Sequence, residues 1–130
     1  MDPARLAKIP LFAALTLDQR NSVADACSEL QIEAGSTLTR EGDFGYAVFA
    51  ITSGAADVVQ NDAVIRKLGP GDVFGEIAVL SGGRRTATVV ARTPMELVTV
   101  LNRDLWKLEE DVPEVAAALR TRIAEHLQPA

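Results

Sequence analysis

The placement of the β-branched residues constrains the fold of this 130-residue chain more than any other feature of its sequence. Most of its valines and isoleucines lie between residues 28 and 102, in short runs that turn sequences separate. β-branched side chains favour strands, whereas Gly, Pro, Asn and Asp mark the turns between them. Such turns are predicted at residues 33–36, 41–43, 53–54, 61–62 and 69–72. The spacing predicts about eight short strands in a sandwich, barrel or roll.

The turn at Asn61-Asp62 has the composition of a tight hairpin. Strand-like sequences precede and follow it, at residues 58–60 and 63–65. Asn and Asp tolerate the positive φ that two-residue hairpin loops require. We therefore expect the chain to reverse direction at these two residues and to pair the flanking strands.

The first 27 residues have the features of a helical segment. Thr16 and Gln19 have the T-x-x-Q spacing of a capping box, in which the two side chains satisfy free backbone N–H groups at a helix start. Val23, Ala24 and Cys27 would then fall on one face of the helix. The pattern thus predicts helix over residues 1–27, ahead of the strands.

Residues 103–128 return to a helical pattern. Asn102 is positioned to cap a first helix, and Pro113 suits the first turn of a second one. In the second helix an apolar residue recurs at every fourth position, which predicts that the helix covers another part of the domain. The residues of this stripe are Val115, Leu119, Ile123 and Leu127.

Composition limits the functions that are open to the chain. Its length suits one domain, and a net charge of −5 with a pI near 4.8 argues against a surface for duplex DNA. Cys27 is the single cysteine, so no internal disulfide is expected. We find no signal-peptide pattern and no run that approaches the ~20 apolar residues that span a bilayer. We therefore expect a cytoplasmic domain, which can also be the cytosolic part of a membrane protein.

Residues 74–88 have the chemistry of an anion site. Gly75 permits a sharp turn and a close approach to a ligand. A helical turn that starts at Glu76 would present unpaired backbone N–H groups to a phosphate, and a Gly-Gly turn would bring Arg85 back beside them. The Glu76 carboxylate fits the same place if it accepts a hydrogen bond from a sugar hydroxyl. The segment therefore suits a ligand with one anionic end and one hydroxyl donor.

This segment resembles the phosphate-binding cassette of the cyclic nucleotide-binding domain family, whose form is F-G-E-(L/I)-A-L, a short loop and R-(A/S/T)-A-(T/S). Here the two halves read Phe-Gly-Glu-Ile-Ala-Val-Leu and Arg-Thr-Ala-Thr. Residues 42–54 and 68–74 resemble the family's strand pair and its lead-in to the cassette. The resemblance implies a mainly β fold, an eight-stranded antiparallel β-roll (a jelly-roll or double-stranded β-helix) with an N-terminal helical segment and two C-terminal helices.

The resemblance also divides the chain into parts. Residues 1–130 would form a single cyclic nucleotide-binding domain. Its parts would be an N-terminal helical segment (1–27), a β-roll (28–102) with the phosphate-binding cassette (74–88), and hinge and lid helices (103–128).

The resemblance further implies a role for each cassette residue. Glu76 would bind the ribose 2′-hydroxyl, and Arg85 would bind the cyclic phosphate. Thr86 would contact the phosphate or the edge of the base through its hydroxyl, whereas Arg84 would make no essential contact. The backbone groups that complete the grip would be those of Gly75, Ile77 and Ala78.

Residues outside the cassette are implied to enclose the base. Its lining would consist of Val58, Leu68 and Phe74, with the stem of Arg66. The last helix would act as a lid, hinged within residues 105–113, although its apolar stripe can equally be static core. The lid residues expected to touch the base are Leu119, Arg120, Arg122 and Ile123.

The implied ligand is a cyclic nucleotide, with cyclic AMP slightly favoured over cyclic GMP, and no cofactor or metal is expected. The implied function is regulation without catalysis, in which ligand binding repositions the C-terminal helix. An effector such as a channel, a transporter or a kinase would be the protein partner. Neither a direct nucleic-acid partner nor membrane insertion is expected from this segment.

Other functions remain open at this stage. A degenerate domain of the same fold could bind a protein and no nucleotide, which the presence of both Glu76 and Arg85 opposes. A cupin-like enzyme shares the β-roll, but its metal site needs several histidines with a carboxylate, and the chain has one histidine, His126. No serine or cysteine comes with a suitable base, so no catalytic residue is expected. A regulator of the catabolite activator type would need a helix-turn-helix after residue 128.

Overall fold

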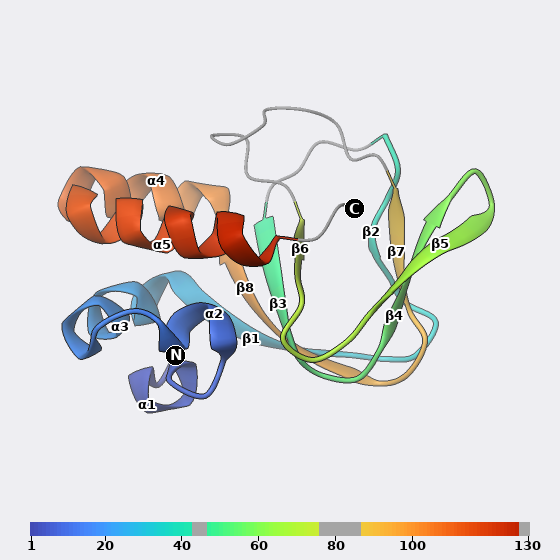
Figure 1. Cartoon of the computed structure of the whole chain (residues 1–130), viewed down its shortest axis with the longest axis horizontal. Coiled ribbons are helices and arrows are strands. Elements are labelled where there is room, and N and C mark those ends of the chain that lie inside the picture. The colour runs from blue at the N-terminus through green and yellow to red at the C-terminus, as the bar shows by residue number, and fades with distance from the viewer. Residues whose placement is uncertain (43–46, 76–86, 128–130) are drawn as a thin grey trace.

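The computed structural model describes residues 1–42, 47–75 and 87–127 (Figure 1). Within these residues the chain forms helices at both ends and eight strands between them. The helices gather on one side of the β-structure (Figure 1). The mainly β class and the helical ends that the sequence predicts are therefore confirmed.

The N-terminal segment is a series of short helices and not one long helix. Its elements are α1 (Pro3–Leu6), α2 (Pro10–Ala13), α3 (Leu17–Val23) and the 3-10 helix η1 (Ala24–Ala26). The capping box at the start of α3 is confirmed, because Gln19 N–H donates to Thr16 Oγ1 at 3.1 Å and Thr16 N–H donates to Gln19 Oε1 at 2.9 Å. The helical prediction is wrong for Cys27, which begins the first strand and pairs with Val100.

The strands form two four-stranded antiparallel sheets. The first has the order β1-β8-β3-β6 and the second the order β2-β7-β4-β5. The strands of the first sheet are β1 (Cys27–Ile32), β8 (Met95–Leu101), β3 (Ala47–Ser53) and β6 (Val73–Gly75). Those of the second are β2 (Thr37–Thr39), β7 (Thr88–Ala91), β4 (Ala56–Gln60) and β5 (Ala63–Leu68). The helices lie beside the first sheet, and the second sheet is farther from them (Figure 1).

The predicted hairpin joins β4 to β5. Asn61 has a φ of 52° and Asp62 a φ of 63°, so both central residues occupy the left-handed region that such a loop requires. Val59 pairs with Val64 and Val58 with Arg66, which leaves Ile65 as an extra residue in β5. The hairpin prediction is confirmed, and the bulge fixes which side chains of β5 face the same way as those of β4.

Two apolar clusters form the core, and β3 contributes to both. Phe49 and Ile51 point into the space between the sheets, where they pack with residues of the second sheet. Val48 and Ala50, on the opposite face of β3, pack against the helices. Successive side chains of a strand point to opposite faces, so a strand with a core on each side is apolar throughout. We call these the inner cluster and the helix-side cluster.

The C-terminal helices are α4 (Asn102–Asp111) and α5 (Pro113–His126). Pro113 occupies the first turn of α5, as predicted. The prediction that Asn102 caps α4 is wrong by one residue, because the helix starts at Asn102 and its cap position is Leu101, which has no side-chain acceptor. No helix in the described part of the chain is long and apolar enough to cross a membrane.

The apolar stripe of α5 is buried in the helix-side cluster. Val115, Leu119 and Ile123 pack there with side chains from the N-terminal helices, among them Phe12. Helix α5 contacts α4, α2 and α3. The periodicity in the sequence is confirmed, and the surface that the helix covers comes from the opposite end of the chain.

Candidate functional site

The cassette links the two sheets. Strand β6 ends at Gly75 in the first sheet, and β7 begins at Thr88 in the second. The five cassette residues to which the sequence assigns the main ligand contacts lie outside the described residues: Glu76, Ile77, Ala78, Arg85 and Thr86. Their roles remain predictions. The structure establishes how the two ends of the cassette are held.

At the first end, the backbone at position 75 accepts only glycine. Gly75 has a φ of +119° and pairs with Val48 of β3. A Cβ at this position would lie 2.5 Å from the carbonyl oxygen of Ala47 and 3.2 Å from Cα of Val48. The sequence predicts a close approach to a ligand here, and the structure adds a close approach to the backbone of β3. Glycine therefore fixes the backbone at the residue where the first sheet ends.

At the second end, hydrogen bonds and burial hold the start of β7. The backbone N–H of Glu41 donates to Oγ1 of Thr88 at 2.9 Å, which ties this strand to the turn that follows β2. Ala87 is buried in the inner cluster. The residues directly after Arg85 and Thr86 are therefore anchored in the second sheet.

The structure brings together the apolar residues that are predicted to line the base. Val58, Leu68 and Phe74 are all buried in the inner cluster, although they come from three strands. The ring of Phe74 stacks on that of Phe49, with centroids 5.2 Å apart and planes 20° from parallel. Arg66 stands opposite Val58 in the β4–β5 pair. Contact of these side chains with a base remains a prediction.

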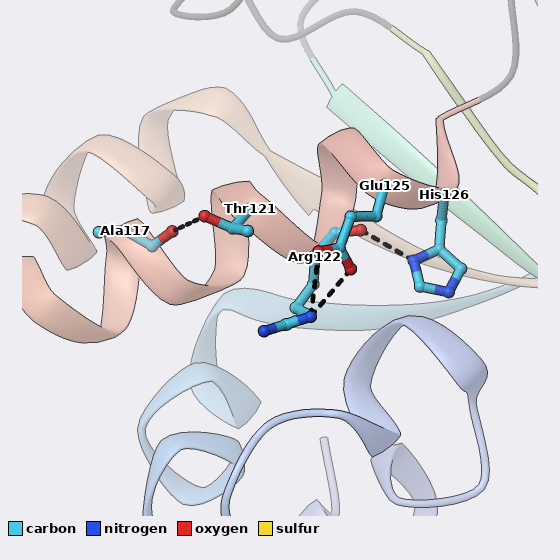
Figure 2. A network of polar contacts seen from close by, with 5 residues as sticks. All are labelled: Ala117, Thr121, Arg122, Glu125 and His126. Atoms are coloured by element: carbon cyan, nitrogen blue, oxygen red, sulfur yellow. Dashed lines mark hydrogen bonds and ion pairs between the residues drawn. The ribbon is translucent and has the colours of Figure 1, made fainter.

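The four predicted lid residues lie with the helices and not with the base-lining residues. Leu119 and Ile123 are fully buried in the helix-side cluster. Arg120 forms an ion pair with Glu109 of α4. Arg122 binds Glu125, three residues further along the same helix, at 2.9 Å (Figure 2). In this conformation Leu119, Ile123 and Arg120 hold α5 against its neighbours, whereas the Arg122 pair lies within α5 itself.

The residue that follows α5 contacts the strand that leads into the cassette, a contact that the sequence does not predict. Leu127 forms a parallel β-bridge with Val73, which is the first residue of β6 and lies two positions before Gly75. One residue earlier, Nδ1 of His126 is 2.8 Å from the carbonyl oxygen of Arg122 (Figure 2). The apolar period of α5 reaches Leu127 and marked it as buried, but a backbone bridge leaves no signal in a sequence.

Cys27 has no part in this site. It is buried in the helix-side cluster, and burial raises the pKa of its thiol from 9.0 to about 12. The N-terminal ammonium lowers this pKa and Asp104 raises it, both less than burial does. The thiol is therefore protonated at neutral pH. In the described ranges, no three His, Cys, Asp or Glu side chains come together as metal ligands.

Comparison with known proteins identifies the family. The family described as "Cyclic nucleotide-binding domain" matches residues 29–111, which include seven of the strands, both anchors of the cassette and α4. The chain belongs to this family. The cyclic nucleotide-binding domain is thus confirmed for this chain, and its β-roll is the two-sheet structure described above.

The chain is similar to proteins of three kinds. The chain is 38% identical over 109 residues to a cAMP-dependent protein kinase regulatory subunit of Aspergillus niger, which covers 82% of this chain and 26% of that protein. It is 32% identical over 120 residues to a cyclic nucleotide-gated potassium channel of Rhizobium etli, covering 92% and 34%. A crystal structure of a cyclic nucleotide-binding domain from Methylobacillus flagellatus superposes with a TM-score of 0.79 at 23% identity, covering 92% and 70%, and supports the fold alone.

The chain therefore spans about a quarter of the length of the fungal subunit and about a third of that of the channel. In both, the matched domain is one part of a longer protein.

Proposed function

We propose that this domain binds a cyclic nucleotide between its two sheets, under the cassette, and acts as a regulatory module that performs no chemistry on it. One observation carries the proposal. The sequence Phe-Gly-Glu…Arg-Thr-Ala-Thr begins at Phe74 in one sheet and ends at Thr88 in the other, and both Phe74 and Ala87 belong to the inner cluster. A cyclic nucleotide has an anionic phosphate and a flat, largely apolar base. The cassette suits the phosphate, and the apolar cluster suits the base.

The charged residues of the cassette would bind the ends of the ligand. Arg85 would donate charge-assisted hydrogen bonds to the cyclic phosphate, assisted by backbone N–H groups of residues 75–78. Glu76 would accept a hydrogen bond from the ribose 2′-hydroxyl. A net charge of −5 does not oppose this arrangement, because salt screens the overall field within ~10 Å whereas these contacts are direct.

Cyclic AMP is the ligand that we favour slightly over cyclic GMP. Three fungal relatives, 35–39% identical to the chain, are named cAMP-dependent protein kinase regulatory subunits. The hydroxyl of Thr86, directly after the cassette arginine, suits either base. The preference is therefore a matter for direct measurement.

Signalling would pass through α5. The helix is docked on α2, α3 and α4, and its end is bridged to β6 beside the cassette. A ligand can shift such an arrangement only by the difference between its affinities for two conformations, and ~1–3 kcal/mol is typical of allosteric coupling. The break at Val112, between α4 and α5, would be the hinge. In a longer cytoplasmic protein, the moving helix would act on an effector such as a kinase or a channel.

Titration calorimetry with three nucleotides tests the binding proposal. We expect saturable binding of cyclic AMP or cyclic GMP by the chain, and much weaker binding of linear 5′-AMP, which has the same base and sugar but no ring through the phosphate. Absence of heat with both cyclic nucleotides, confirmed by an unchanged melting temperature at millimolar ligand, would overturn the proposal.

A further inference from the structure

A row of four side chains crosses the inner face of the second sheet. Thr39 of β2 pairs with Val89 of β7, Val89 pairs with Val58 of β4, and Val58 pairs with Arg66 of β5. Residues directly opposite each other in antiparallel strands point to the same face. Because Val89 and Val58 belong to the inner cluster, Thr39 faces the space between the sheets too.

The hydroxyl of Thr39 is buried and has no partner among the described residues. Thr39 is 5% exposed, and no residue in the described ranges forms a hydrogen bond with its Oγ1. Leaving a buried hydroxyl unpaired costs ~1–3 kcal/mol. Such a group therefore needs a reason to be present.

Thr99 shows how the same side chain is accommodated elsewhere in the roll. It is 7% exposed and also lies in a strand, but its hydroxyl donates to the carbonyl oxygen of Val48 at 3.2 Å. A threonine in this fold can thus reach a neighbouring strand carbonyl. Thr39 does not, although β2 is adjacent to β7.

The chemistry of the row matches a purine. Val89 and Val58 lie beside Thr39 in the row, fully buried in the inner cluster, and their apolar side chains suit the face of a flat base. Thr39 at one end adds a group that can both donate and accept a hydrogen bond. The polar edges of adenine and guanine carry such donors and acceptors, so either base could satisfy it.

We propose that Oγ1 of Thr39 hydrogen-bonds the polar edge of the six-membered ring of the bound base, and that it favours ligands with a polar edge. This inference rests on the proposed function, since it places the base of the cyclic nucleotide against Val89 and Val58. It adds a residue outside the cassette and outside the expected base lining.

Thr39→Val is the variant that tests the contact, with Thr39→Ser as its matched control. Valine keeps the shape of threonine and removes the hydroxyl, whereas serine keeps the hydroxyl. In calorimetry with cyclic AMP we expect about tenfold weaker binding for the valine variant, which corresponds to ~1.4 kcal/mol, and less than threefold for serine. The melting temperature of ligand-free Thr39→Val should equal or exceed that of the parent chain, because an unpaired buried hydroxyl is removed.

A base analogue locates the hydrogen bond. The cyclic nucleotide of benzimidazole keeps the shape of the base but lacks the ring nitrogens and the exocyclic group of the six-membered ring. We expect the parent chain and Thr39→Val to bind it with equal affinity. The role of Thr39 would be overturned if Thr39→Val bound the analogue as much more weakly than the parent chain as it binds cyclic AMP, or if it lost no affinity for cyclic AMP. Binding of cyclic AMP by the parent chain would leave the proposed function intact in either case. Failure of the parent chain to bind either cyclic nucleotide would overturn both.

Discussion

Single residues at the ends of the cassette set the geometry of the site. Gly75 is confined by a positive φ and by the backbone of β3, and Thr88 is held by the backbone of Glu41. Neither constraint involves a side-chain contact with the ligand. Sequence motifs of binding sites therefore contain two kinds of residue, those that contact the ligand and those that place the contacts.

Arg85 is proposed as a residue that contacts the ligand, so Arg85→Ala should weaken binding with little effect on the fold. Loss of the guanidinium leaves the phosphate charge without its partner, and removal of one member of a buried charged pair costs roughly 2–5 kcal/mol. At ~1.4 kcal/mol for each factor of ten, affinity for the cyclic nucleotide should fall at least about tenfold. Calorimetry measures this loss, with the neighbouring Arg84→Ala as the control that should retain most of the affinity. If Arg85→Ala bound the cyclic nucleotide with unchanged affinity, Arg85 would not be a ligand contact.

Gly75→Ala should destabilise the fold before any ligand is added. The left-handed backbone alone costs an alanine roughly 1–2 kcal/mol, and the contact with Ala47 O at 2.5 Å adds to it. Gly35→Ala is the matched control, because Gly35 has a φ of +88° but nothing within 4 Å of its Cβ position. Urea unfolding should show a loss of more than 2 kcal/mol at residue 75 and about 1 kcal/mol at residue 35. Equal losses would mean that β6 moves away from β3 without cost.

At the scale of elements, α5 is the feature that sequence reasoning described least completely. A period of four correctly indicated which side chains are buried. It carried no information on what covers them, because α2 and α3 come from the other end of the chain. The same limitation applies to Cys27, whose apolar position fits a helix face and a strand equally well. Its pairing with Val100 decides between them.

The hinge proposal predicts a local change in amide exchange. On binding cyclic AMP, protection of the amides in residues 113–127 should change, because the ligand shifts α5 between two arrangements. Amides in the β1–β8 pair, which precedes α4 and the break at Val112 in the chain, serve as the internal control and should change little. Hydrogen-exchange mass spectrometry resolves both segments. Identical protection of α5 with and without ligand would leave the domain without a moving helix.

At the scale of the whole molecule, local signals predicted most of the fold. Asn61 and Asp62 identified a hairpin, Thr16 and Gln19 a helix start, and residues 74–88 the family. Each of these patterns is complete within a few neighbouring positions. The row from Thr39 to Arg66 was not predicted, because it draws one residue from each of four strands. Its members meet only after the register of the second sheet is known.

Global stability should depend on pH through Cys27. In the folded chain its thiol has a pKa of about 12, against 9.0 for a free thiol, so above pH 9 the unfolded chain loses a proton that the folded chain keeps. The unfolded chain then binds fewer protons, and stability falls as pH rises. Between pH 8 and pH 10 the parent chain should lose about 1 kcal/mol more than Cys27→Ala, measured by urea unfolding. Parallel pH profiles of the two chains would contradict the raised pKa.

Strand β3 is shared by both apolar clusters, with Phe49 on one side and Val48 on the other. Neither half of the core can therefore dissolve while the other persists, because the loss of this one strand opens both. Heating should then melt roll and helices together, in a single transition whose calorimetric and van't Hoff enthalpies agree. The free energy of binding a ligand between the sheets therefore also stabilises the helices behind them, and no separate pathway of residues is needed to couple the two.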